Sequence, residues 1–204
     1  SSTMGGSQVY LKEGEVFTID ELLYALMVQS GNDAAVALAI HVAGTKDGFT
    51  ELMNEKAAAL GMTNTQFHSV HGLPPGAGQE PDVSTPRDMS LLCRELLKHK
   101  DTLRYTSTKE RPFRPDAKEP FIMRNHNPLL ASFEGCDGFK TGYFTKAGYS
   151  MAVTAMRKDS RVIAVILGSA DRKTRNAKAA ELMAKGFLEL GKKEGLKSKV
   201  QSPK

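Results

Sequence analysis

The chain has 204 residues, of which 40% are hydrophobic and 25% are charged, and its formal net charge is +5 at pH 7. These values exclude an intrinsically disordered protein and allow one large domain or two small ones. The longest apolar runs, such as 162–167, are far too short for a transmembrane helix, and the first residues lack a basic region followed by an apolar one. We expect any signal peptide to have been removed or to lie outside these residues.

A capping box marks the first predicted helix. Thr18 precedes Glu21 by three residues, so each side chain can satisfy a free backbone N–H group of the other residue. The residues that follow place four apolar side chains on one helical face: Leu22, Leu23, Leu26 and Met27.

Three further helices follow in the first half. The first helix breaks at 30–32, and Asn32 is the predicted N-cap of a second helix over 33–42. A third helix is expected over 47–60, with Gly61 as its C-terminal glycine. After an irregular segment rich in glycine and proline, Thr85 is the predicted N-cap of a helix that runs to about residue 99.

The period of the hydrophobic pattern changes in the second half. Segments 139–143, 149–156 and 161–167 have the composition of strands, and a polar break at 158–160 predicts a hairpin between the last two. An amphipathic helix over about 174–190 would cover one face of the sheet. The predicted class is therefore α+β, an antiparallel sheet with covering helices plus a mostly helical part.

Lysines concentrate at the C-terminal end of the sequence. We predict a basic tail or linker over 191–204, after a domain that spans 1–190. A positive charge favours an anionic polymer as partner, whether nucleic acid, membrane surface or cell wall. Because no zinc-finger or RNP signature is present, we expect no nucleic acid partner.

The two cysteines define neither a metal site nor a cellular compartment. Cys93 lies in an apolar helical run and is expected in the core, whereas Cys136 precedes an Asp-Gly pair. The sequence leaves open whether they form a disulfide. We expect no metal and no cofactor.

Two short motifs carry the chemistry. Lys140-Thr141-Gly142 lies on a predicted strand, and Ser30-Gly31-Asn32 lies at a break between helices. Each is weak alone, and a turn followed by an N-cap explains the second motif fully. Together, in this order and setting, they match two of the three signatures of the active-site-serine enzymes that recognise penicillin.

Further segments strengthen this match, and with them the chain resembles the D-alanyl-D-alanine carboxypeptidases, which are low-molecular-weight penicillin-binding proteins. The segments that resemble this family are 5–11, 22–39, 60–67, 71–73, 84–89, 125–130, 137–143 and 161–168. The resemblance implies a β-lactamase/transpeptidase-like fold, an extracytoplasmic bacterial location and two ligands, the peptidoglycan stem peptide ending in D-Ala-D-Ala and β-lactam antibiotics. Membrane attachment through a segment outside the chain would fit this family.

The resemblance also implies roles for catalytic residues. Ser30 would relay a proton between the base of the nucleophile and the leaving D-alanine. Asn32 would bind the peptide backbone of the substrate, and Lys140 would place positive charge near the reacting carbonyl group and the terminal carboxylate.

Five further residues would bind the substrate. Thr141, with Gly142 beside it, would donate a hydrogen bond to the carboxylate, and Tyr143 would lend its backbone N–H to the oxyanion hole. Arg175 aligns with an arginine that binds the terminal carboxylate. His126 stands where relatives carry an arginine that lines the site.

Simpler interpretations compete with these roles. Arg175 has the pattern of a solvated arginine on a helix face, which the residues alone favour, and His126 that of a structural or surface histidine. Lys140 is different, because a lysine at the start of an apolar strand is costly unless it is exposed or paired. A position in a cleft is therefore expected for Lys140.

The third family signature, Ser-x-x-Lys, does not occur in the sequence, because no serine has a lysine three residues later. In the family this motif supplies the nucleophile and its base, on a helix well upstream of Ser30. We therefore expect the first strands and the nucleophile helix to be missing, either because the chain is a piece of a longer protein or because it is a pseudoenzyme. In both cases this chain alone is not expected to carry out the family reaction.

Three functions remain in competition. The first is a serine-type D-Ala-D-Ala carboxypeptidase that acts through an acyl-serine. The second is a serine β-lactamase, which is less favoured because the Glu-x-x-x-Asn pattern of a deacylating glutamate is absent between Ser30 and Lys140. The third is a non-catalytic module that binds cell-wall peptides.

Overall fold

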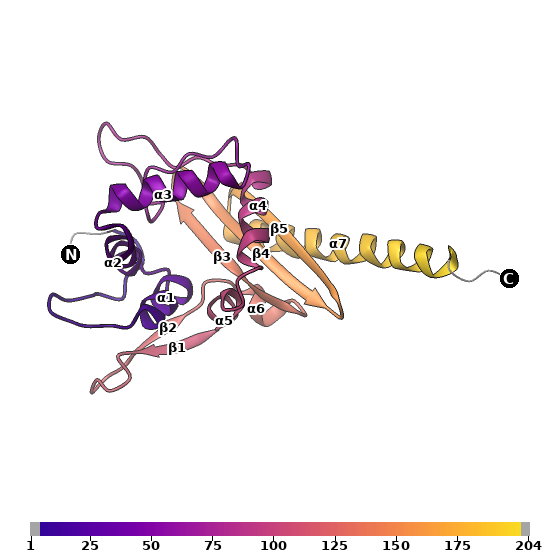
Figure 1. Cartoon of the computed structure of the whole chain (residues 1–204). Helices are drawn as coiled ribbons and strands as arrows, with labels where there is room; N and C mark the ends of the chain where they lie inside the picture. The colour runs from indigo at the N-terminus through magenta and orange to yellow at the C-terminus, as the bar shows by residue number, and fades with distance from the viewer. Residues whose placement is uncertain (1–4, 201–204) are drawn as a thin grey trace.

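The computed structural model describes the backbone of residues 5–200 and the side chains of residues 5–192. The first half is helical, and the second half holds a three-stranded antiparallel sheet followed by a long helix (Figure 1). The predicted α+β class is therefore confirmed.

Three helices form the N-terminal part: α1 (Ile19–Val28), α2 (Asn32–Ala43) and α3 (Lys46–Ala59). The predicted capping box is confirmed, because Thr18 Oγ1 accepts from Glu21 N at 3.2 Å and Glu21 Oε2 accepts from Thr18 N at 2.8 Å. The prediction that Asn32 caps α2 is wrong. The N-cap is Gly31, because the backbone there is still extended, and Asn32 is already the first helical residue.

A buried carboxylate fixes the next helix to the irregular segment before it. Helix α4 (Pro86–Leu96) begins after the predicted N-cap Thr85, whose Oγ1 accepts from Asp88 N. The Asp88 side chain is 2% exposed and accepts from Asn64 N and Thr65 Oγ1, each at 2.8 Å. Asp88 therefore has a structural role beyond the helix-dipole interaction that its position suggests.

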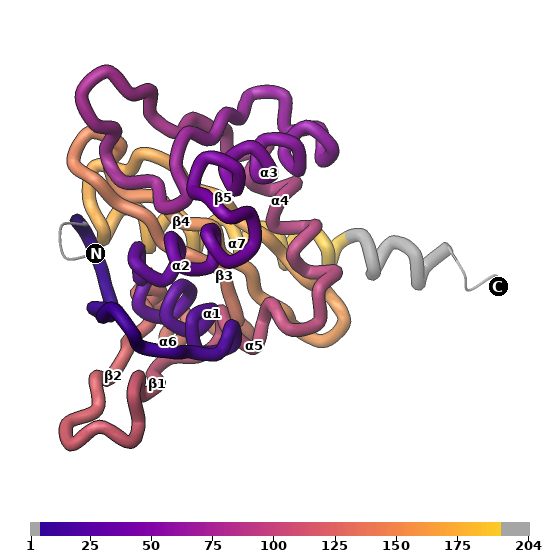
Figure 2. The backbone as a smooth tube through the Cα atoms, turned by 60° about the vertical axis from the view of Figure 1, so that its left-hand side comes forward, coloured from indigo at the N-terminus to yellow at the C-terminus, as the bar shows by residue number. Residues whose placement is uncertain are grey.

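Four short elements follow that the sequence did not indicate: α5 (Thr102–Thr106), β1 (Glu110–Phe113), β2 (Phe121–Arg124) and α6 (Leu129–Ser132). Strands β1 and β2 form a hairpin that projects from the body of the protein (Figure 2). Arg114, directly after β1, contacts both carboxylate oxygens of Glu15 and donates to Val9 O at 2.9 Å. The hairpin thus holds the segment that precedes α1.

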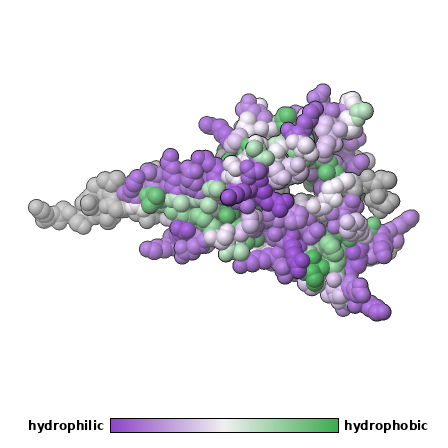
Figure 3. Space-filling model, turned by 180° about the vertical axis from the view of Figure 1, so that it is seen from behind, coloured by the Kyte–Doolittle hydropathy of each residue, from purple (hydrophilic) through white to green (hydrophobic). Residues whose placement is uncertain are grey.

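The main sheet is a meander of β3 (Cys136–Phe144), β4 (Gly148–Arg157) and β5 (Ser160–Ser169). The three predicted strands are confirmed, and each extends slightly beyond its predicted bounds. Helix α7 (Arg172–Val200) packs against β5 and β4 and continues past the predicted end at residue 190. Seen from behind, hydrophobic side chains gather along α7 beside hydrophilic surface (Figure 3).

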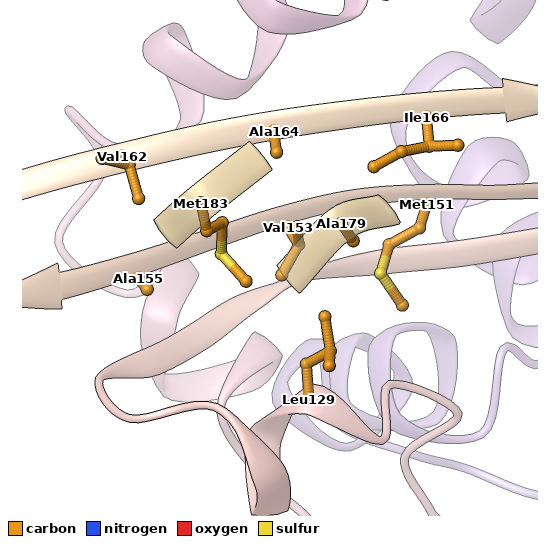
Figure 4. Close-up of a cluster of buried hydrophobic side chains, with 9 residues drawn as sticks. All are labelled: Leu129, Met151, Val153, Ala155, Val162, Ala164, Ile166, Ala179 and Met183. Carbon is orange, nitrogen blue, oxygen red and sulfur yellow. The ribbon is translucent and has the colours of Figure 1, made fainter. Parts of the chain in front are cut away.

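The larger core lies between the sheet and α7 (Figure 4). Its buried members are Leu129, Met151, Val153, Ala155, Val162, Ala164, Ile166, Ala179 and Met183. A second cluster, which includes Val9, Tyr24, Phe113 and Met123, joins the N-terminal segment and α1 to the hairpin. Helices α5 and α6 both contact β3, the strand that carries Lys140.

The cysteines are unpaired with one another. Cys93 is 2% exposed, which confirms its predicted place in the core, and Cys136 is half-buried at the start of β3. No disulfide joins the two thiols in the structure.

Within the described residues, none of the helices combines the length and the apolar character that a membrane span requires. Residues 201–204 of the predicted basic tail lie outside the described residues. The proposed boundary between 1–190 and 191–204 stays a prediction.

Candidate active site

A hydrogen bond joins the two motifs that the sequence singled out. Lys140 Nζ lies 2.7 Å from Ser30 Oγ, and the same ammonium donates to the carbonyl of Thr141 at 2.9 Å. Ser30 lies between α1 and α2, and Lys140 lies in the middle of β3. The two motifs, which lie in different halves of the chain, therefore meet in the structure.

A tight turn aims the Ser30 side chain. Ser30 has φ of +62°, in the left-handed region that residues with a Cβ rarely adopt. Gly31 N then returns to Ala25 O at 3.0 Å and closes the end of α1. A Cβ on Gly31 would lie 3.2 Å from both Ala25 O and Asp33 Oδ1, so a side chain at this position would meet close neighbours.

Contacts on both sides of β3 fix the position of Lys140. Asp137 accepts two hydrogen bonds from Arg161 of β5, at 2.7 and 2.8 Å, and its carbonyl accepts from Thr106 Oγ1 at 2.7 Å. Lys140 itself pairs with Ala152 of β4. The strand is therefore anchored to α5 and to the sheet three residues before the lysine.

Arg175 supplies a second positive charge behind Lys140. Its side chain is 3% exposed and donates to Asn176 Oδ1 at 2.8 Å and to Ser150 O at 3.4 Å. The interpretation of Arg175 as a solvated arginine is therefore wrong, because its side chain turns inward from α7 toward β4. No carboxylate pairs with this guanidinium among the residues whose side chains are described.

Burial and this second charge change the proton affinity of the lysine. Burial, together with the positive charge of Arg175, lowers the pKa of Lys140 from 10.5 to about 8. Burial also lowers the pKa of Arg175, with Arg172 as a further cause. A substantial share of Lys140 is thus a neutral amine slightly above physiological pH, beside a hydroxyl group.

His126 lies at the edge of the same cluster. Partial burial lowers its pKa, and the charges of Lys140, Arg172 and Arg175 lower it further. The residues on both sides of His126 are anchored, since Asn125 Nδ2 donates to Thr108 O and Asn127 Oδ1 accepts from Leu129 N. The imidazole is exposed, and its predicted contact with substrate stays a prediction.

Thr141, Gly142 and Tyr143 continue β3 toward solvent. Thr141 is half-buried, Gly142 is exposed with open space around its Cα, and the Tyr143 ring is 55% exposed and stacks on Tyr149 at 4.1 Å. Because β3 is an edge strand of its sheet, one side of its backbone has no strand neighbour within the described part of the chain. Of these three residues, Thr141 contacts the Ser30–Lys140 pair, because its carbonyl accepts from Lys140 Nζ.

Asn32 is bound by the N-terminal segment. Its side-chain Nδ2 donates to Gly5 O at 3.0 Å, and its backbone N–H donates to Ser7 O at 2.9 Å. The side chain is buried, so the predicted contact with a substrate backbone requires its Oδ1 atom or a displacement of Gly5. That contact stays a prediction.

One member of the charged cluster, Arg172 at the start of α7, was not predicted from the sequence. The signal available for it was the run 171–175, in which three of the five residues are basic. A hollow of about 500 Å³ lies beside it, lined by Leu129, Arg172, Lys173, Asn176, Ala177 and Ala180.

The arrangement suits acyl chemistry on an anionic substrate. Lys140, Arg172 and Arg175 give the site a positive potential, which attracts a carboxylate. The amine of Lys140, whose pKa is lowered to about 8 and which contacts a hydroxyl group, can move a proton.

Comparison with known proteins gives one consistent family. A family model described as D-alanyl-D-alanine carboxypeptidase matches residues 1–171. The chain is 36% identical over 187 residues to the D-alanyl-D-alanine carboxypeptidase DacF of Bacillus subtilis strain 168, covering 92% of this chain and 47% of that protein. It is 39% identical over 184 residues to DacC of Escherichia coli strain K12, covering 90% of this chain and 44% of that protein. The chain thus spans just under half the length of these curated relatives.

Solved structures agree with the sequence relatives. The D-alanyl-D-alanine carboxypeptidase DacD of Francisella tularensis superposes with a TM-score of 0.82 at 29% identity, covering 89% of this chain and 55% of that one. Penicillin-binding protein D2 of Listeria monocytogenes, in its ampicillin-bound form, gives 0.76 at 30% identity, covering 90% and 74%. The fold that the resemblance implied is therefore confirmed.

Proposed function

The chain belongs to the D-alanyl-D-alanine carboxypeptidase family, and we propose that the natural protein carrying it removes the terminal D-alanine from peptidoglycan stem peptides. The observation that carries this proposal is the 2.7 Å hydrogen bond between Lys140 Nζ and Ser30 Oγ. It joins two family motifs across 110 positions of sequence. The ampicillin-bound neighbour supports a second ligand class, the β-lactams.

The proposed reaction is acyl transfer through a serine. The acyl-forming serine belongs to a Ser-x-x-Lys motif, which residues 1–204 do not contain. Ser30 relays the proton to the leaving D-alanine, with Lys140 as its partner. Asn32 holds the substrate backbone.

The remaining residues bind and polarise the substrate. Thr141 and Arg175 bind the terminal carboxylate, with Gly142 leaving room beside them and His126 lining the site. The N–H of Tyr143 donates to the oxyanion as negative charge develops in the tetrahedral state. The buried guanidinium of Arg175 and the open edge of β3 support these assignments.

The proposed setting is the bacterial cell wall outside the cytoplasmic membrane, where peptidoglycan is exposed to such enzymes. We propose a serine-type peptidase that affects cell shape, either periplasmic or on the outer face of the membrane. Membrane attachment would come from a segment other than the helices described above.

The test uses the natural protein that contains this sequence. We expect it to release D-alanine from a D-Ala-D-Ala pentapeptide and to be labelled covalently and stably by a fluorescent penicillin. Ser30→Ala and Lys140→Arg should each lower the release rate roughly 100-fold. The matched controls, Ser132→Ala and Lys98→Arg on the exposed surface, should leave it unchanged.

Other outcomes would redirect the assignment. Rapid turnover of penicillin would favour a serine β-lactamase. A protein that binds muropeptides, yet neither releases D-alanine nor becomes labelled, would be the non-catalytic module, and the peptidase proposal would be overturned.

A further inference from the structure

Ser30 has the backbone setting of a reactive serine. Its φ of +62° is a strained value for a residue with a Cβ, and it occurs between the end of α1 and the start of α2. In unrelated hydrolases a strained turn between a strand and a helix exposes the nucleophilic serine, whereas the strained turn at Ser30 joins two helices. The N-terminus of α2 also favours negative charge that develops beside Ser30.

Lys140 has the setting of a base rather than of a structural cation. Its ammonium forms no ion pair among the residues whose side chains are described. The charged and titratable groups that interact with it are Arg175 of α7 and His126 before α6, and Arg175 in turn interacts with Arg172 and Tyr149. Burial favours the neutral amine of Lys140, and the positive charge of Arg175 acts in the same direction.

We propose that Ser30 is itself a nucleophile in this chain, activated by Lys140, and that the pair reacts with small activated carboxylic esters. Serine–lysine pairs are an established variant of the serine–histidine arrangement in unrelated enzymes. This activity goes beyond the proposed D-alanine release, in which Ser30 only relays a proton to another group.

The proposed step is an ordinary acyl transfer. With p-nitrophenyl acetate, Ser30 Oγ bonds to the carbonyl carbon while its proton passes to Lys140 Nζ. The bond from that carbon to the phenolic oxygen breaks, and p-nitrophenolate leaves with the electron pair. Lys140 gives its proton to solvent, and water then hydrolyses the acetyl ester of Ser30 to acetate and the free hydroxyl group.

The experiment treats the 204-residue chain with p-nitrophenyl acetate and maps the acetylated peptides by mass spectrometry. We expect acetyl on the peptide that contains Ser30 and a matching release of p-nitrophenolate. The rate should rise with pH and level off above about 8, as Lys140 loses its proton. Ser30→Ala should remove this label, whereas Ser132→Ala, at an exposed serine of α6, should not.

Two variants separate a base from a structural lysine. Lys140→Arg keeps the charge and can donate to Ser30, but it cannot accept a proton, so labelling should fall at least tenfold, in line with the loss of a general base. Lys98→Arg is the exposed control. Arg175→Gln removes a neighbouring charge, so the midpoint of the pH profile should move upward.

Three results would each overturn the proposal. The first is an acetyl label on surface lysines but not on Ser30, and the second is a Lys140→Arg variant that is labelled as fast as the original chain. The third is a pH–rate profile whose midpoint does not change in the Arg175→Gln variant. Circular dichroism confirms that each variant is folded. If one of these results is obtained, the proposed release of D-alanine by the natural protein still stands, because that reaction depends on a different nucleophilic serine and is measured with a different substrate.

Discussion

At the scale of single residues, the pair Ser30 and Lys140 combines a proposed role in proton transfer with a cost in stability. Lys140 is half-buried beside Arg175, and both side chains carry positive charge at pH 7. The pKa of Lys140 lies below its ordinary value, so folding disfavours the charged form. Below about pH 8 the charged Lys140 therefore lowers the stability of the fold by its full amount. This penalty decreases as the pH rises from about 8 toward 10.5.

We predict that Lys140→Met abolishes D-alanine release by the natural protein and stabilises the chain by about 1 kcal/mol at pH 7. The stabilisation should shrink as the pH rises from about 8 and disappear above 10.5, because the original lysine is then neutral in both the folded and the unfolded states. Urea denaturation at several pH values measures it. Lys98→Met, on the exposed surface, should change stability by less than about 0.5 kcal/mol. A Met variant that is less stable than the original chain would contradict this interpretation.

Sequence reasoning reached the residue pair only through the family motifs. Nothing local marks Ser30 and Lys140 as neighbours, since a contact across 110 positions depends on how the two halves pack. The burial of Arg175 was missed because its sequence neighbours are polar, as on any exposed helix face. The Arg175 guanidinium donates to the carbonyl of Ser150, which tertiary packing brings close, and to the side-chain oxygen of Asn176, the next residue of the helix.

At the scale of elements, local signals were sufficient where the stabilising interaction is itself local. The caps at Thr18 and Thr85 are formed within three residues, so their helix starts were predicted correctly. The N-cap of α2 was misassigned by one residue, because Asn32 binds the distant Gly5 instead of capping its own helix. The hairpin β1–β2 was missed because its strands are only four residues long each and the first contains Pro112.

The start of β3 offers a test of how closely two elements approach. Gly135 has φ of +80°, and a Cβ there would clash with the carbonyl oxygen of Met156 on β4. We predict that Gly135→Ala destabilises the chain by about 2 kcal/mol or more.

The matched control is Gly191→Ala in α7, where a Cβ meets open space. Alanine is the better helix former there, so this variant should gain about 0.5–1 kcal/mol. Denaturation midpoints in urea compare the two. Equal effects at both positions would show that the close approach of Gly135 to β4 is absent.

At the scale of the whole molecule, a few contacts between distant segments set the geometry of the site. Arg114 of the hairpin binds Glu15 across 99 positions and holds the segment that leads into α1 and Ser30. The same segment is held from the other side by Asp33, whose carboxylate accepts from Val9 N and Leu11 N. The position of Ser30 therefore depends on interactions that involve neither of the two motifs.

The Glu15–Arg114 pair gives a prediction with a defined pH range. Hydrogen bonds from Arg114 lower the pKa of Glu15 from 4.5 to about 2. The pair stabilises the fold fully above pH 4.5, and this stabilisation is lost as the pH falls toward about 2. We expect Glu15→Gln to cost about 2 kcal/mol at pH 7, the value of a charged hydrogen bond, and progressively less in acid.

Glu181→Gln is the control for this pair, because Glu181 forms an exposed pair with Lys178 three residues away in α7. Such pairs contribute about 0.5 kcal/mol or less. Thermal melts from pH 7 to pH 3 distinguish the variants. A Glu15→Gln penalty that does not decrease in acid would contradict the assigned role of this carboxylate.

A double-mutant cycle tests whether Ser30 and Lys140 act as one unit in a single site. The rate of D-alanine release is measured for the natural protein, for Ser30→Ala, for Lys140→Arg and for the double variant. If the two residues act through their shared hydrogen bond, the double variant should be no slower than the slower single variant. Losses that multiply independently would show that the two side chains work apart and would contradict the account.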